Sequence, residues 1–162
     1  MNIFVVEKNP IDAARQLPDK LICKMPVETA QMLCTAHRLL STEKYCTEKK
    51  LYKKAFWNHP CTIWARETHC NYLWLLKHWV ALCDEFQQRY GKQHKSYTDL
   101  HAGLSELPSM IPVGNLTNFA QAMPIQYKNL NNPVQAYRKY MIAEKHYAQW
   151  NKGSKKPYWW KL

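Results

Sequence analysis

The feature that most constrains the fold is a long helical pattern that runs from Pro18 to Leu40. Its apolar residues recur at intervals of four or seven, and a helix of 3.6 residues per turn places such residues on one face. The stripe comprises Leu21, Met25, Met32 and Leu39. We predict a helix that buries this face. Pro26 lies inside the pattern, where its missing donor and its ring predict a kink or a split into two pieces.

One carboxylate, Glu28, shares the apolar face of this helix. Burial would disfavour its charged form and raise its pKa, which is typical of a carboxyl group that exchanges protons near neutral pH. The alternative interpretation is structural, with Glu28 at the edge of the stripe and paired with Lys24 one turn earlier. Composition alone favours the structural interpretation.

Three other helices are indicated. A short helix from Pro10 to Gln16 is predicted because Asn9 can cap it and proline suits the first helical position. A second long helix, Cys61 to Tyr90, is predicted to be central and largely buried, with Gly91 as its C-cap. A further helix is expected from Pro133 to Trp150. The buried stripe predicted for the second long helix is Ile63, Cys70, Leu73, Leu76, Val80, Cys83 and Phe86.

The segments between these patterns are polar. We predict an exposed connector with a cationic face from Ser41 to Lys54, a short helix from Thr98 to Glu106, one or two helical turns from Thr117 to Met123, and a loop from Pro124 to Asn132. The chain is therefore expected to form one all-α domain over residues 1–162, with about three main helices and long ordered connections. Residues 151–162 form a basic aromatic tail, which we expect on or next to a nucleic-acid site.

The charge balance points to a polyanionic partner. Lys and Arg number 23 against 12 Asp and Glu, and the net charge is +11. Aromatic residues make up 13% of the chain, with seven Trp and ten Tyr. Cations mixed with aromatic planes favour nucleic acid over an acidic membrane surface. No segment approaches the length of a membrane span or a signal sequence, so we expect a soluble, intracellular protein with reduced, mostly buried cysteines.

Two local clusters carry candidate binding residues. Asn58, His59 and Arg66 are expected near the start of a helix, where the dipole attracts a phosphate, although a capping and ion-pair cluster is an equally good interpretation. The tail alternates cations with stacking planes, or else its aromatic residues fix the carboxyl terminus to the core. The tail residues are Lys155, Lys156, Tyr158, Trp159 and Trp160. The Cys and His spacings do not fit a structural zinc site, so no metal or other cofactor is expected.

Several stretches of the sequence resemble one enzyme family. They are the apolar amino terminus, the run Lys24-Met25-Pro26-Val27-Glu28-Thr29-Ala30-Gln31-Met32-Leu33, the run Tyr52-Lys53-Lys54-Ala55-Phe56-Trp57-Asn58-His59-Pro60, the helix end Arg89-Tyr90-Gly91 and the aromatic basic terminus. In this order they resemble the pyrimidine-dimer DNA glycosylases, the phage endonuclease V family. The resemblance covers most of residues 1–95 and the tail.

The resemblance implies a metal-free DNA glycosylase with abasic-site lyase activity. In that family the α-amino group at the start of the chain attacks the sugar C1′ and forms a Schiff base, and a helix glutamate moves protons. The residues carried over are Met1, Asn2 and Glu28, and nearby cations would lower the pKa of the amine. The cations expected at the amine or on DNA are Arg15, Lys20, Lys24, Lys53 and Lys54. Because residue 2 is Asn rather than a small residue, the nucleophilic amine would belong to Met1.

The partner expected from this resemblance is damaged or modified duplex DNA in a bacterial or phage-infected cell. We expect a cytoplasmic monomer without an obligate protein partner. Two alternatives remain at this stage. The same charge and aromatic residues would serve a nucleic-acid-binding protein without chemistry, whose affinity falls steeply with salt. An enzyme acting on free nucleotides would show little preference for polymers.

Overall fold

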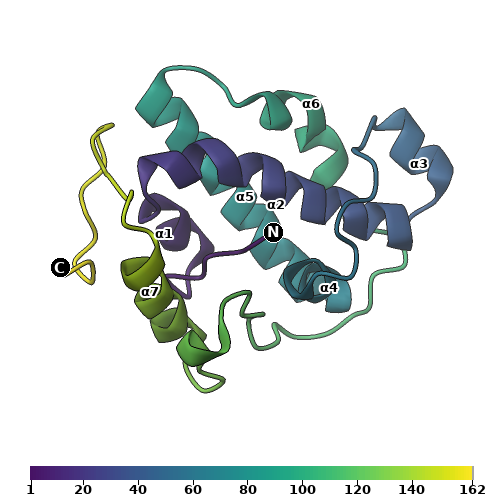
Figure 1. Ribbon diagram of the computed structural model, residues 1–162. Coiled ribbons are helices and arrows are strands. Elements are labelled where there is room, and N and C mark those ends of the chain that lie inside the picture. The colour runs from purple at the N-terminus through teal and green to yellow at the C-terminus, as the bar shows by residue number, and fades with distance from the viewer. Residues whose placement is uncertain (162) are drawn as a thin grey trace.

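Two long helices form the centre of the molecule. The computed structural model describes residues 1–161, and over that range the chain is helical with no strand. Helix α2 (Asp19–Leu40) packs along α5 (His69–Tyr90), and shorter helices surround this pair (Figure 1). These are α1 (Pro10–Arg15), α3 (Glu43–Glu48), α4 (Pro60–Glu67), α6 (Lys95–Leu104), the 3₁₀ turn η1 (Ile125–Tyr127) and α7 (Pro133–Glu144). The all-α class and the single compact domain are confirmed, and shorter helices accompany the main ones.

Helix α2 is continuous through Pro26, so the predicted split is wrong. The proline and the neighbouring Met25 are buried, and the Pro26 carbonyl accepts a hydrogen bond of 3.0 Å from the Trp79 indole of α5. This bond and the burial of Pro26 hold the proline-containing turn against α5. Three of the four predicted stripe residues, Leu21, Met25 and Met32, are buried as expected.

The second long helix is two helices, because the chain breaks at Thr68. Thr68 is extended, with φ −142° and ψ 157°, and its hydroxyl caps α5 by accepting from the Asn71 amide at 3.1 Å. The same hydroxyl donates to the Asn115 carbonyl at 3.0 Å, and the His69 amide donates to the Pro112 carbonyl at 2.8 Å. A distant loop thus satisfies the backbone groups that the break exposes.

The buried face of α5 also differs from the predicted one. Tyr72, Leu75, Trp79 and Leu82 are fully buried, whereas of the predicted stripe only Cys83 is buried and Ile63 is 37% exposed. The buried set has the 3-4-3 spacing of a helix face and carries larger side chains. Tyr72 and Trp79, which lie outside the predicted stripe, therefore form part of the core.

The remaining segments depart from the predictions at several boundaries. The connector contains α3 and buries Cys46 and Leu51. Helix α6 begins three residues earlier than predicted, α7 ends at Glu144 instead of Trp150, and residues 117–123 are irregular. The predicted start of α1, its Asn9 cap and the left-handed Gly91 at the end of α5 are confirmed. None of the helices within residues 1–161 is long and apolar enough to cross a membrane.

A buried ion cluster joins the end of α5 to the end of α1 and the start of α2. The Arg89 side chain is 1% exposed and pairs with Glu85 at 2.9 Å and Asp19 at 3.1 Å. It also donates to the carbonyls of Leu17 and Arg15, at 2.8 and 3.0 Å. Arg89 thus pairs with the backbone carbonyls of the turn that joins α1 to α2.

We expect Arg89→Met to lower the free energy of unfolding by about 3–5 kcal/mol, because Glu85 would remain buried without its partner. Urea titration followed by circular dichroism measures the change. Arg15→Gln is the control: that side chain is 62% exposed, and we expect a loss below about 0.5 kcal/mol. Equal losses in the two variants would contradict a stabilising role for the cluster.

Two histidines are buried in the core as neutral groups. Burial lowers the pKa of His37 to about 4 and that of His78 to about 4. His37 bonds to the Tyr72 hydroxyl at 2.9 Å, and His78 bonds to the Pro10 carbonyl at 2.8 Å. Between about pH 6.5 and pH 4, these histidines are therefore protonated in the unfolded chain and neutral in the folded chain.

Stability should accordingly fall as the pH drops from about 6.5 to 4, by about 3 kcal/mol for each histidine. Urea titrations at several pH values measure this fall. The double variant His37→Gln/His78→Gln is expected to be less stable at pH 7 and to lose less on acidification. A variant curve parallel to that of the natural chain would contradict the prediction.

Candidate active site

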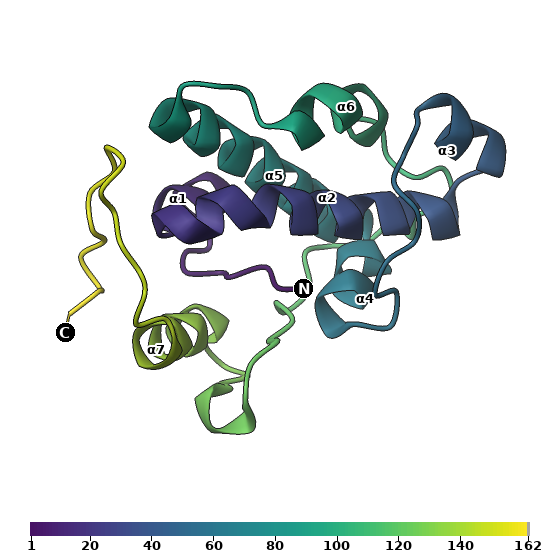
Figure 2. The same ribbon diagram turned by 45° about the horizontal axis from the view of Figure 1, so that its top comes forward.

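The first six residues run between α4 and α7 (Figure 2), and most of this segment is buried. Ile3, Val5 and Val6 are 0% exposed. Phe4 has a left-handed backbone, with φ 36°, and the Val6 amide donates to its carbonyl at 2.8 Å. Its ring stacks parallel to Tyr140 of α7. Such a strained conformation persists only where packing fixes it, so the amino terminus has a defined direction.

Asn2 anchors this segment with its side chain. The Asn2 Oδ1 accepts from the amides of Ile3 and Phe4 at 2.8 and 3.3 Å, and its Nδ2 donates to the Ala122 carbonyl at 2.8 Å. Ala122 is fixed in turn by Tyr137 of α7, whose hydroxyl accepts from the Ala122 amide and donates to the Ala120 carbonyl. Asn2 is 7% exposed, so its side chain holds the chain start in place and is not free to contact a substrate.

The amino terminus and Glu28 meet at the end of this segment. The amine of Met1 lies 3.7 Å from Glu28 Oε2, and Lys24 Nζ lies 2.9 Å from Glu28 Oε1. The Met1 side chain is 1% exposed and Glu28 is 16% exposed. The ion pair expected under the structural interpretation is therefore present, but the carboxylate also faces an amine. The hydrogen bond and the charge of Glu28 raise the pKa of Lys24.

His59 lies close enough to the Met1 amine and to Glu28 for their charges to affect its pKa. It caps α4, with Nδ1 accepting from the Cys61 amide at 3.2 Å. Its pKa is lowered, mainly by burial and further by the positive charge of the amine, while Glu28 acts in the opposite direction. A neutral imidazole thus borders the site at neutral pH.

Residues after the first hundred complete this region, and no sequence pattern predicted them. Lys145 lies 4.8 Å from the ring centre of Tyr140 and 6.0 Å from that of Phe4. Lys20 lies 4.5 Å from the ring centre of Tyr147. Both tyrosines are near enough to affect the pKa of Lys24. Their contacts with Phe4 and Lys20 join segments that are over a hundred residues apart, which no local pattern can reveal.

The other predicted binding residues are distributed over the surface. Arg66, in the last turn of α4, donates to the carbonyls of Trp57 and Thr62, both at 2.9 Å, and so ties the helix to the loop before it, while His59 is the cap. Asn58, Lys53 and Lys54 are exposed. Arg15 instead pairs with Asp12 and borders a separate hollow with Lys77, Asp84 and His101.

The tail packs onto the core through its tryptophans. Trp159 and Trp160 are 9% and 5% exposed, Trp160 meets Trp150 edge to face, and Trp159 bonds to Gln16. The interpretation that aromatic residues fix the carboxyl terminus is therefore correct for these two. Tyr158, 70% exposed, remains accessible together with Lys155 and Lys156.

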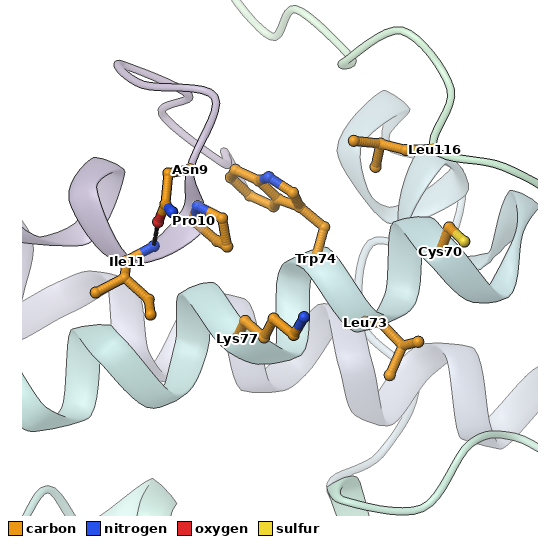
Figure 3. Close-up of a pocket in the computed structure, with 8 residues that line it drawn as sticks. All are labelled: Asn9, Pro10, Ile11, Cys70, Leu73, Trp74, Lys77 and Leu116. Atoms are coloured by element: carbon orange, nitrogen blue, oxygen red, sulfur yellow. Dashed lines mark hydrogen bonds between the residues drawn. The ribbon is translucent and has the colours of Figure 1, made fainter.

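A cavity of about 510 Å³ lies elsewhere, between the start of α1 and α5 (Figure 3). Its lining is largely apolar and consists of Asn9, Pro10, Ile11, Cys70, Leu73, Trp74, Lys77 and Leu116. The cavity has no carboxylate or imidazole on its wall, so its chemistry differs from that of the Glu28 site.

Comparison with known proteins places the chain in a family. The family model described as "Pyrimidine dimer DNA glycosylase" matches residues 1–99, which include the amine, Glu28 and His59. No curated protein and no solved structure matches the chain. The match covers more than half of the 162 residues and contains both groups that meet at the amino terminus. The chain belongs to the pyrimidine dimer DNA glycosylase family.

Proposed function

We propose that the protein is a DNA glycosylase with abasic-site lyase activity, acting on pyrimidine dimers or another damaged or modified pyrimidine in duplex DNA. The observation that carries this proposal is the 3.7 Å approach of the Met1 amine to Glu28 in a partly buried site. An amine beside a carboxylate has the two groups that imine chemistry at a sugar requires, a nucleophile and a proton carrier.

In the proposed reaction the neutral amine attacks C1′, and the new N–C1′ bond replaces the bond to the base. The base leaves with the bonding electrons and takes up a proton. The C1′–O4′ bond then opens, O4′ gains a proton, and the nitrogen becomes an imine. Loss of a proton from C2′ expels the 3′ phosphate oxygen, and water finally releases the amine. Glu28 is the group we propose for the proton transfers at C1′ and O4′, with Lys24 stabilising its charge.

The proposed DNA surface surrounds this site. Lys24 pairs with Glu28, Lys20 lies over Tyr147 and Lys145 over Tyr140 of α7. Exposed Lys53 and Lys54 precede α4. Accessible tail residues, Lys155, Lys156 and Tyr158, would contact DNA beyond the start of α2. The net charge of +11 supports a duplex as the partner, with a nucleotide extruded for access to C1′. We propose that a monomer suffices, in a bacterial or phage-infected cell.

Borohydride trapping tests the proposal. Incubation with ultraviolet-irradiated or abasic duplex should give a covalent adduct whose peptide mass assigns it to the first residue. Glu28→Gln should reduce the single-turnover rate by about 10²–10⁴-fold, because the amide cannot exchange protons. Glu48→Gln is the control, because it removes an exposed carboxylate paired at 3.9 Å and should leave the rate unchanged. The absence of an adduct on irradiated, abasic and modified duplexes, despite salt-dependent binding, would favour the non-catalytic alternative.

A variant of Asn2 tests whether the position of the Met1 amine matters for the reaction. Asn2→Ala removes three hydrogen bonds that orient the chain start, so we expect trapping to slow by at least about tenfold, since small displacements of reacting groups cost large factors. DNA affinity should change little. Asn9→Ala, which removes the cap of α1, is a comparable loss at another site and should slow trapping much less. Equal trapping rates for Asn2→Ala and the natural chain would argue against an amine positioned by Asn2.

A further inference from the structure

Two neighbouring aromatic rings are exposed in the loop before α4. Phe56 is 68% exposed and Trp57 is 48% exposed. All four Phe and seven Trp lie within the described residues 1–161, and the other nine are buried or half-buried there. Two adjacent large apolar side chains left in water are typical of a contact surface.

The backbone that carries these rings is firmly held. The Thr35 hydroxyl of α2 accepts from the Ala55 amide at 3.1 Å and donates to the Ala55 carbonyl at 3.2 Å. The Phe56 carbonyl accepts from the His59 amide at 2.9 Å, and the Trp57 carbonyl accepts from Arg66 at 2.9 Å. Phe56 has a left-handed backbone with φ 44°. A braced, strained loop presents its side chains in fixed positions, which lowers the entropy cost of binding.

The charge around the rings indicates what they contact. Lys54 Nζ lies 5.1 Å from the ring centre of Trp57, and Lys53 is exposed beside it. The sequence from Lys49 to Arg66 contains five cations and no Asp or Glu: Lys49, Lys50, Lys53, Lys54 and Arg66. Cations that flank exposed rings suit a partner with phosphates and flat apolar faces, which is nucleic acid.

The loop also adjoins the proposed reaction site. Helix α4, which the loop enters, lies beside the amino terminus in both views of the molecule (Figures 1 and 2). His59, three residues after Phe56, is within electrostatic range of the Met1 amine and of Glu28. Rings at this place would meet the bases next to the sugar that the amine approaches.

We infer that Phe56 and Trp57 form an aromatic wedge that stacks on the bases flanking the processed nucleotide and stabilises the opened duplex. The inference rests on the proposed function for the identity of that nucleotide. The lysines of the loop would neutralise the adjacent phosphates, and the rings would replace the stacking that is lost when a nucleotide leaves the helix.

Binding to a duplex with a tetrahydrofuran abasic analogue tests the wedge without any chemistry. Trp57→Ala and Phe56→Asn, whose asparagine tolerates the left-handed backbone, should each weaken binding by about tenfold. The slope of affinity against salt should stay unchanged in both, whereas Lys54→Gln should reduce that slope by about one phosphate contact. Trp57→Phe should restore most of the affinity. Ile11→Ala, 42% exposed in the α1–α5 cavity, is the matched control and should bind normally.

A second measurement reports on the base stack itself. With 2-aminopurine next to the analogue, the natural protein should increase its fluorescence and the two ring variants should not. Ring variants that match Ile11→Ala in affinity and in fluorescence would overturn the inference, even if borohydride traps an imine. Conversely, a loss of affinity confined to the ring variants, without any imine on damaged DNA, would support the wedge and refute the proposed chemistry. The variants are at exposed positions, and circular dichroism checks that they fold.

Discussion

The burial of the amino-terminal segment is the constraint on which the rest of the site depends. Three of its residues are fully buried, and Asn2 ties it to Ala122, 120 positions away. A chain end usually frays, because few contacts hold it. Here the hydrogen bonds of Asn2 and the stacking of Phe4 on α7 fix the direction of Met1 and Asn2. The segment after the family match therefore contributes to the site, because Tyr137 of α7 holds Ala122, to which Asn2 is bonded.

Helix α2 sets the distances between the parts of the proposed DNA surface. The tail contacts it at Asp19, which accepts from the Asn151 amide, the carboxylate site is at Glu28, and the aromatic loop is fixed at Thr35. At 1.5 Å per residue, Asp19 and Thr35 are about 24 Å apart along the axis. That length corresponds to about seven base pairs of B-form DNA at 3.4 Å each. A continuous helix through Pro26 fixes the spacing of these three positions along the axis, which a split helix would not.

Local signals in the sequence predicted local structure well and tertiary structure poorly. The Asn9 cap and the left-handed Gly91 need only their own helices, and both were predictable. The break at Thr68 was not, because a threonine inside an apolar run becomes a cap only where a loop such as Pro112–Asn115 satisfies the exposed amides. The same limit applies to the site. Glu28 was identifiable from its stripe and its surrounding motif, whereas the anchoring role of Asn2 depends on a partner in an irregular segment.

The two cations at Glu28 are not equivalent, and the difference matters for the proposed chemistry. The contact with Lys24 is short, at 2.9 Å, while the Met1 amine lies at 3.7 Å. The pKa of Lys24 is raised by Glu28, so Lys24 keeps its proton over the physiological range. The carboxylate therefore retains a charged partner when the amine is neutral, and loss of the amine proton does not leave Glu28 unpaired. His59, whose pKa is lowered, is neutral and adds no positive charge that would repel a sugar cation. In the proposed reaction, the amine, held by the longer of the two contacts, would move toward C1′, and Glu28, kept charged by Lys24, would stabilise the cation that develops there.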